Sequence, residues 1–159
     1  DVMQVALPHF EESSASFCRT MSSSMSRSER EWVAQGASEA DVLSRLYDVW
    51  TYKEALTKNM GLGLGYDFAR IDLRFGRDVR LAMDGRAVDT YRFRELALPC
   101  GASSRAPGSR VAIALGPRDA WEAPMSKQAV PAQQAMDEGW LRMWTYDAWL
   151  DYAWAMSGV

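Results

Sequence analysis

One helical stretch that ends in a run of glycines constrains this chain more than any other feature. Between positions 40 and 60, apolar residues and one lysine recur at intervals of three and four: Val42, Leu46, Val49, Trp50, Lys53 and Leu56. Such spacing is typical of the buried face of a helix. Ser38 suits an N-cap, Lys58 is a cation in the last turn, and Gly61 suits the C-terminal cap. The pattern predicts a helix over about 40–60.

The glycine run that follows, Gly61 to Gly65, admits two interpretations. Backbone N–H groups of a glycine-rich loop can approach a phosphate closely. A dinucleotide-binding fingerprint, however, follows a strand and precedes a helix, and its third glycine is missing here. The sequence therefore favours a helix stop with a turn over a nucleotide site.

Residues 70–93 fit strands and helices equally well. Ile71, Leu73 and Phe75 alternate with polar residues, and Asp84-Gly85 is a strong signal for a hairpin turn. Residues 78–86 also fit a helical turn and a half. Periodicity does not decide between the two for segments this short.

The chain as a whole is predicted to be mostly α, with amphipathic helices joined by irregular segments and a short β-hairpin around 78–93 as an alternative. Residues 1–37 form a Ser-rich arm that orders only on a partner, because serines compete for backbone hydrogen bonds. Residues 38–131 form the core. Residues 132–159 form a long C-terminal helix that contains four of the seven tryptophans and, being apolar almost all round, is suited to burial against a partner.

The residue types that carry catalysis and metal binding are sparse. His9 is the one histidine, and Cys18 and Cys100 are far apart with no ligand spacing. Pairs of carboxylates, such as Asp147 with Asp151, are interpreted as solvated helix surface. The sequence thus predicts no catalytic residue, no cofactor, no metal and no small-molecule substrate, and the chain is predicted not to be an enzyme.

Arginines and aromatic residues alternate between positions 70 and 94, a composition that suits single-stranded nucleic acid or a protein interface. Interleaved acidic residues neutralise most of this charge, and the formal net charge is −3. The sequence therefore favours a protein partner or lipid headgroups and excludes nucleic acid. The predicted partner-binding residues are Arg70, Arg74, Arg92, Arg94, Trp121, Trp140, Trp144 and Trp149.

Three short segments, in this order, carry a resemblance to a known family: Lys58-Asn59-Met60-Gly61-Leu62, Asp78-Val79-Arg80 and Gly116-Pro117-Arg118-Asp119-Ala120-Trp121. Together they resemble subunit 7 of mitochondrial complex III, the ubiquinone-binding protein family of ubiquinol–cytochrome c reductase. The resemblance implies a non-catalytic accessory subunit of the respiratory chain. It would lie peripherally on the matrix side of the mitochondrial inner membrane, pack on cytochrome b and the core subunits, and contact lipid headgroups.

Two alternatives to this resemblance stay open at the level of sequence. One is an accessory subunit of another respiratory or ATP-synthase complex. The other is a self-contained α+β module with a three-stranded sheet over residues 70–93 that binds RNA or a ligand. A hairpin at Asp84-Gly85 favours the second alternative, and a helix there favours complex III.

Overall fold

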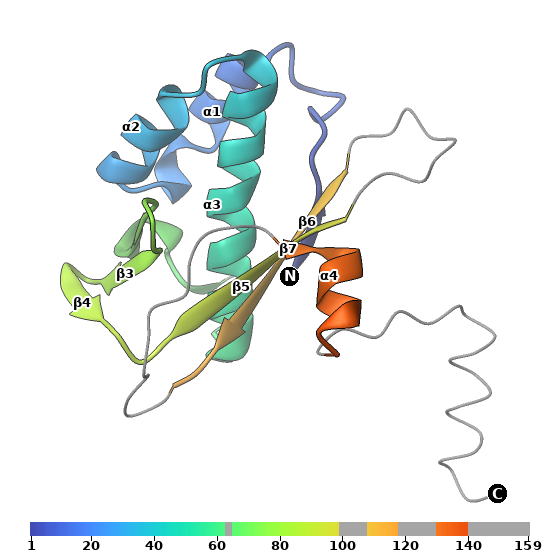
Figure 1. Ribbon diagram of the computed structural model, residues 1–159. Coiled ribbons are helices and arrows are strands. Elements are labelled where there is room, and N and C mark those ends of the chain that lie inside the picture. The colour runs from blue at the N-terminus through green and yellow to red at the C-terminus, as the bar shows by residue number, and fades with distance from the viewer. Residues whose placement is uncertain (63–64, 99–107, 118–129, 140–159) are drawn as a thin grey trace, which may run out of the picture. The chain divides into compact units, whose positions relative to one another are not determined.

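The structure is a computed structural model that describes residues 1–62, 65–98, 108–117 and 130–139. The chain divides into two compact units, residues 1–129 and 130–159. The first unit combines helices with two small antiparallel sheets around the long helix α3 (Glu39–Asn59) (Figure 1).

Helix α3 forms where the sequence predicts it. The Ser38 side chain accepts a hydrogen bond from the backbone N–H of Asp41, and Gly61 takes a φ of 70° just beyond the helix. Glycine adopts this left-handed conformation without steric cost, so it ends the helix cleanly. The predicted bounds and both caps are confirmed.

The larger sheet of the first unit places β6 (Ser109–Leu115) between β1 (Val2–Gln4) and β5 (Arg92–Leu98), all antiparallel. α3 packs against this sheet. Tyr52 and Leu56 from the helix meet Phe93 and Ala112 from the strands in one buried cluster. The pairing of β1 with β6 therefore brings the first residues of this unit next to residues 109–115, and α3 packs against the sheet that they form.

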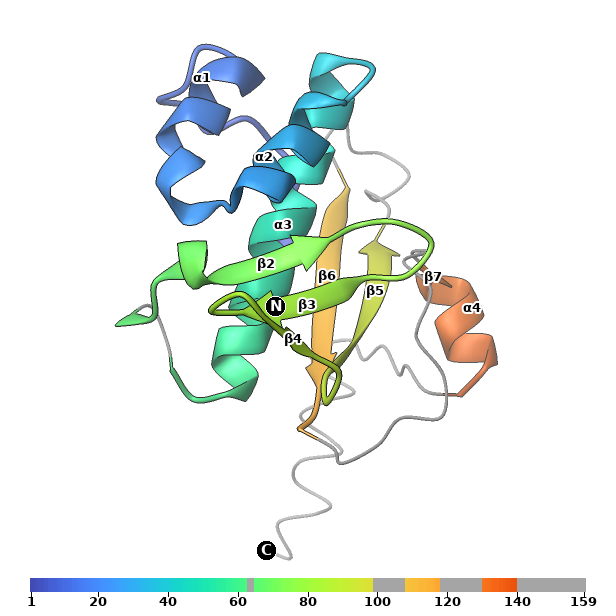
Figure 2. The same ribbon diagram turned by 90° about the vertical axis from the view of Figure 1, so that its left-hand side faces the viewer.

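The smaller sheet consists of β2 (Ile71–Arg74), β3 (Arg80–Met83) and β4 (Arg86–Val88) in that order (Figure 2). Asp84 and Gly85 join β3 to β4 with φ values of 52° and 73°, as a type I′ turn requires. A short 3₁₀ helix, η3 (Phe68–Arg70), leads into β2. The hairpin alternative is thus the correct one.

The prediction of a mostly α fold is wrong, because the first unit is α+β. The physical reason lies in the alternation along β2: Ile71 and Leu73 are 0% and 1% exposed, whereas Asp72 is half-buried and Arg74 is exposed. This period of two buries one face of a strand, and a helix cannot reproduce it.

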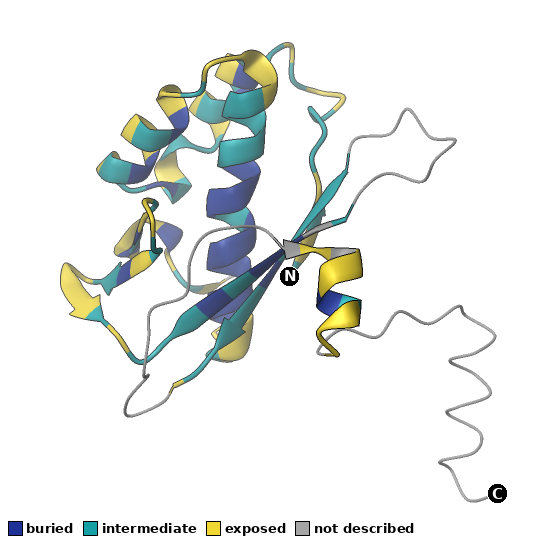
Figure 3. Ribbon diagram, viewed as in Figure 1, coloured by how far each residue is buried: buried dark blue, intermediate teal, exposed yellow. Residues whose placement is uncertain are grey.

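The Ser-rich N-terminal region also differs from its prediction as a partner-dependent arm. It forms α1 (Ser14–Thr20), the 3₁₀ helix η1 (Ser22–Ser24) and α2 (Arg27–Ala34). Ser13 and Ser26 begin α1 and α2 with capping boxes, so these serines start helices instead of disrupting them. Phe17, Met25 and Val33 are buried together with residues of α3, the most buried of the helices in Figure 3.

The second unit contains β7 (Val130–Pro131) and α4 (Ala132–Asp137). The predicted long C-terminal helix begins at Ala132 as α4 does, but α4 ends at Asp137, where Glu138 is the cap and Gly139 takes a left-handed φ of 79°. The part of the predicted helix beyond 139 lies outside the described residues. The predicted division at 37/38 and 131/132 stays a prediction. Within the described ranges, no helix has the length and hydropathy needed to cross a membrane.

Candidate functional site

Three charged side chains meet where the start of β1 lies against the C-terminal half of α3. Lys58 Nζ donates to Asp1 Oδ1 at 2.5 Å and lies 3.7 Å from Glu54 Oε2. Glu54 and Lys58 are one helical turn apart and therefore share a face of α3. Asp1 is held in place by two backbone hydrogen bonds with Ala112 of β6. We refer to Asp1, Glu54 and Lys58 as the acidic cluster.

The acidic cluster is accessible from one side only. The Asp1 and Glu54 side chains are 7% and 11% exposed, whereas that of Lys58 is 59% exposed. Asp1 Oδ2 is buried and accepts no hydrogen bond from the described residues. A buried carboxylate oxygen without a donor is unfavourable unless something else binds it. The cluster therefore has an unused acceptor next to a second carboxylate.

This donor set fits a hard divalent cation such as Mg²⁺. Mg²⁺ is usually held by one or two carboxylates, with water and substrate phosphates completing the shell. Asp1 and Glu54 supply two carboxylates, and Asp1 Oδ2 is an acceptor not yet used. Across the described ranges, no group of three or more His, Cys, Asp or Glu side chains is arranged to hold a metal, so a site saturated by protein ligands is not found there.

A second charged pair lies on another side of α3 and is fully buried. Lys53 Nζ donates to Glu29 Oε2 at 2.6 Å, to the Ser24 carbonyl at 2.9 Å and to the Phe68 carbonyl at 2.8 Å. The Lys53 and Glu29 side chains are 1% and 0% exposed. Burial lowers the pKa of Lys53 and raises that of Glu29, while the attraction between the two charges opposes both shifts.

A third polar group connects α3 to β5 and β6. Tyr52 donates to Glu95 at 3.0 Å, and Arg110 Nε lies 3.4 Å from Asp48 Oδ1 and 3.8 Å from Glu95 Oε1. Burial and the neighbouring Glu95 carboxylate raise the pKa of Tyr52 well above its ordinary range. These charges compensate one another within the fold, which favours a structural role.

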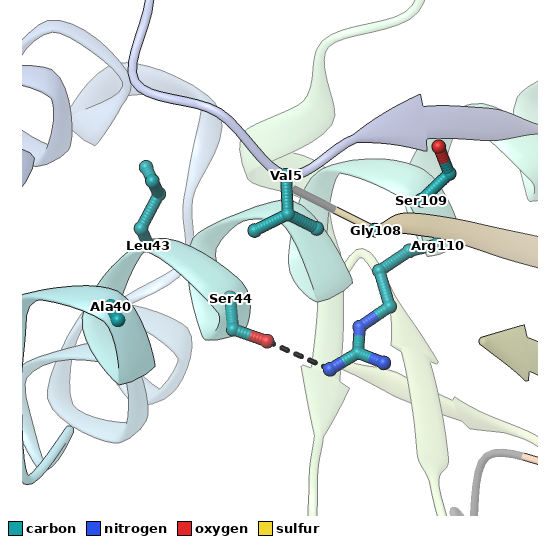
Figure 4. A pocket seen from close by; sticks show the side chains of 7 residues that line it. All are labelled: Val5, Ala40, Leu43, Ser44, Gly108, Ser109 and Arg110. Carbon is teal, nitrogen blue, oxygen red and sulfur yellow. Dashed lines mark hydrogen bonds between the residues drawn. The ribbon is translucent and has the colours of Figure 1, made fainter. Parts of the chain in front are cut away.

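Arg110 also lines a pocket of about 370 Å³ between α3, the end of β1 and β6 (Figure 4). Its Nη2 donates to Ser44 Oγ at 2.9 Å. The remaining lining side chains are small or apolar, among them Val5 and Leu43. The guanidinium lies within ion-pair distance of Asp48 and Glu95, and its buried Nε has no hydrogen-bond partner among the described residues. The pocket lining contains this cation but no carboxylate, so it offers less to a divalent cation than the acidic cluster does.

The arginines predicted to bind a partner do not gather at the acidic cluster. Arg70 forms a bidentate pair with Asp84, at 2.6 and 2.8 Å, and Arg74 pairs with Asp72 at 3.1 Å. Arg92 donates to the backbone carbonyls of Asp89 and Tyr91, and Arg94 is a half-buried residue of β5. Their role toward a partner stays a prediction. The predicted tryptophans lie outside the described residues: Trp121, Trp140, Trp144 and Trp149.

Sequence reasoning missed the acidic cluster. The spacing of Glu54 and Lys58 on the predicted helix was visible, but an i, i+4 pair usually marks a solvated helix face. Asp1 carried no signal at all, because it precedes Lys58 by 57 positions and meets it only through the pairing of β1 with β6. The one usable signal was Lys53, a lysine within an apolar stripe.

Comparison with known proteins identifies relatives of this chain. Residues 1–113 match the family model of the 4'-phosphopantetheinyl transferase superfamily. The chain is also similar to 4'-phosphopantetheinyl transferase pptA of Paxillus involutus, with 37% identity over 98 residues. That alignment covers 60% of this chain and 37% of the relative, so the chain spans little more than a third of the relative's length.

These matches overturn the resemblance to complex III. The predicted family, the predicted lack of enzymatic function, the respiratory-chain role and the partners cytochrome b and core subunits are wrong. The physical reason is that Lys58 to Leu62 is an ordinary helix stop, which many unrelated helices share. Asp78-Val79-Arg80 leads into a strand and not into a helix. The predicted matrix-side location followed from that resemblance and stays untested.

Proposed function

This chain belongs to the 4'-phosphopantetheinyl transferase superfamily, and we propose that its acidic cluster is part of a transferase active site. The proposed reaction moves a 4'-phosphopantetheinyl group from coenzyme A to a carrier protein. The whole reaction is a proposal for this protein, because the alignment covers only 37% of the relative's length.

One observation carries the proposal. Within the residues that match the family, Asp1 and Glu54 lie on either side of one exposed ammonium, and a buried oxygen of Asp1 has no donor among the described residues. Phosphoryl-transfer sites place cations against phosphate oxygens, because catalysis there depends on positioning and charge neutralisation. The acidic cluster supplies one cation, the Lys58 ammonium, and two carboxylates that can hold a second cation.

In the proposed step, an acceptor hydroxyl of the carrier protein forms a bond to the phosphorus that carries the pantetheine arm of coenzyme A. The bond from that phosphorus to the bridging oxygen breaks, and the nucleotide portion leaves with the bridging oxygen. The hydroxyl proton is released to solvent, and no oxidant or reductant is needed.

Each residue of the acidic cluster has a distinct task in this step. Asp1 and Glu54 would hold a divalent cation through carboxylates that are mostly shielded from water. Lys58, on the exposed side, neutralises charge on the phosphates of the donor. When bound, a divalent cation there would withdraw charge from the phosphate oxygens. Without the carboxylates, Lys58 alone would bring one positive charge to a donor that carries several negative ones.

The direct test uses the intact protein with coenzyme A, Mg²⁺ and a carrier protein that lacks its pantetheine arm. We expect mass spectrometry to show the carrier gaining the mass of one phosphopantetheinyl group. Asp1→Asn and Glu54→Gln should each reduce the initial rate by about 10²–10³-fold, the usual effect of removing one charge-stabilising contact. A chelator should abolish the reaction, and added Mg²⁺ should restore it.

Glu31→Gln is the matched control. Glu31 pairs with Arg27 one helical turn away on α2, and its side chain is 59% exposed. The same chemical change there should leave the rate unaltered. A carrier that gains no mass, or equal rates for Glu54→Gln and Glu31→Gln, would overturn the proposed function.

A further inference from the structure

The buried pair Lys53–Glu29 occupies a place in the fold that links it to the acidic cluster. Lys53 directly precedes Glu54 on α3, and consecutive helical residues point about 100° apart. The Lys53 ammonium uses all three of its N–H groups, one on Glu29 and two on backbone carbonyls. Nothing is left over for a ligand, so the pair itself is not a binding site.

Glu29 extends these contacts to two further elements. Its Oε2 also accepts from the Ser26 N–H at 2.7 Å, and its Oε1 accepts from the Leu73 N–H at 2.8 Å. Through Lys53 and Glu29, α3 is therefore tied to the start of α2, to η3 and to β2. These contacts fix both the rotation of α3 about its axis and its position along that axis.

Stability alone is a weak explanation for such a pair. Removing two charges from water is so costly that well-packed apolar residues often serve as well or better. An apolar contact tolerates sliding, however, whereas five hydrogen bonds of defined direction do not. The pair therefore fixes the position and direction of Lys53, the residue next to Glu54 on α3.

On the sheet side of the same turn, Tyr52 donates to Glu95. Glu54 therefore follows two consecutive anchored residues. The carboxylates of Glu54 and Asp1 both lie within ion-pair distance of the Lys58 ammonium, and the backbone of Asp1 is fixed separately by β6. A small rotation of α3 would move Glu54 relative to Asp1, and errors of about 1 Å in a catalytic site can cost on the order of 10²-fold in rate.

We propose that Lys53 and Glu29 are positioning residues that hold Glu54 and Lys58 in register with Asp1. This inference rests on the proposed function, because it assumes that the acidic cluster binds a divalent cation. It assigns no contact with substrate or cation to Lys53 or Glu29.

The test measures Mn²⁺ binding to the intact protein by electron paramagnetic resonance, and no turnover is required. In Lys53→Met the Kd for Mn²⁺ should rise by about 10-fold or more, as expected when supports of a metal site are lost. Glu29→Gln, which keeps the size of the side chain, is the second variant and should shift the Kd in the same direction. Circular dichroism establishes which of the two variants is folded.

Val33→Ala is the matched control for lost stability. Val33 lies on α2, four positions after Glu29, and is 2% exposed in the same helical layer. Its truncation should lower the melting temperature and leave the Mn²⁺ affinity unchanged. A shift in Val33→Ala equal to that in Lys53→Met would overturn the positioning role.

The outcomes separate this inference from the proposed function. If Glu54→Gln weakens Mn²⁺ binding while folded Lys53→Met or Glu29→Gln does not, the positioning role is wrong and the proposed function stands. If Glu54→Gln itself leaves Mn²⁺ binding unchanged, the metal site fails and the positioning role fails with it.

Discussion

Two sides of one helix show how the same residue types serve different ends. Toward α2 and β2, Lys53 and Glu29 form a pair that is buried and fully hydrogen-bonded. Toward β1, Asp1, Glu54 and Lys58 form a cluster in which the Lys58–Glu54 distance of 3.7 Å is too long for a hydrogen bond. Both sides combine lysine with carboxylates.

The two sides differ in which polar groups lack a hydrogen-bond partner. The buried pair has used the donors of Lys53 and both oxygens of Glu29, so it can only hold elements together. The acidic cluster keeps a buried oxygen of Asp1 without a donor in the described structure and an ammonium exposed to solvent. Incomplete satisfaction at a partly exposed site indicates function, whereas complete satisfaction in the core indicates architecture.

Lys53→Met should produce the largest loss of stability. It leaves the Glu29 carboxylate buried without its cation, which typically costs about 3–5 kcal/mol. Because burial raises the pKa of Glu29, the folded variant binds a proton more readily than the unfolded chain. The deficit relative to wild type should therefore grow as pH rises through that elevated pKa and shrink at lower pH. Urea unfolding across a pH series measures this, and a pH-independent loss below 1 kcal/mol would contradict it.

Glu54→Gln should behave in the opposite way. The Glu54 side chain is 11% exposed, and its Oε2 lies 3.7 Å from Lys58 Nζ, beyond hydrogen-bond distance. Replacing it by a side chain of similar size should therefore change the free energy of unfolding by about 1 kcal/mol or less. The transition state of the proposed transfer should lose about 2.7–4 kcal/mol, seen as a lower kcat. A large loss of stability with unchanged kcat would show that Glu54 has a structural role, like Lys53 and Glu29 on the other side of α3.

Tyr52→Phe examines the contact between α3 and the larger sheet. It removes the hydrogen bond to Glu95, a residue that is 6% exposed, and should cost about 1–2 kcal/mol in unfolding free energy. Thermal unfolding measures the change. A stabilised variant would show that the hydroxyl contributes no net stability there.

Asp72→Asn should have the smallest effect. Burial opposes ionisation of Asp72, but hydrogen bonds from Ser26 and Ser28 and the nearby Arg74 lower its pKa overall. A lowered folded-state pKa adds stability above the ordinary value of 3.8, and this stability is lost as pH falls through the lower one. The wild type should exceed the variant by less than about 1 kcal/mol at pH 7 and by nothing in strong acid. Acid unfolding of both proteins checks the sign.

The sequence was sufficient where local chemistry decides the structure. Ser38 and Gly61 specify the ends of α3, and Asp84-Gly85 specifies a hairpin, because each depends on backbone geometry within a few residues. It was insufficient for β2 and β3, where four-residue segments suit either structure until tertiary packing buries Ile71 and Leu73.

The candidate site could not be predicted from neighbouring residues in the sequence, for a related reason. Glu54 and Lys58 are visible as a helical pair, but their meaning depends on Asp1, which arrives through the pairing of β1 with β6. The predicted partner role of the arginines of residues 70–94 stays a prediction. Arg70 and Arg74 stand out by composition, yet each is paired with an aspartate of the same small sheet.

Anomalous X-ray diffraction from crystals of the protein soaked in Mn²⁺ would show whether the acidic cluster binds a divalent cation. We expect an anomalous peak at which carboxylate oxygens of both Asp1 and Glu54 are ligands, among them Asp1 Oδ2, which has no donor among the described residues. An Asp1–Lys58 contact that persists in a crystal with Mn²⁺ bound elsewhere would contradict this expectation.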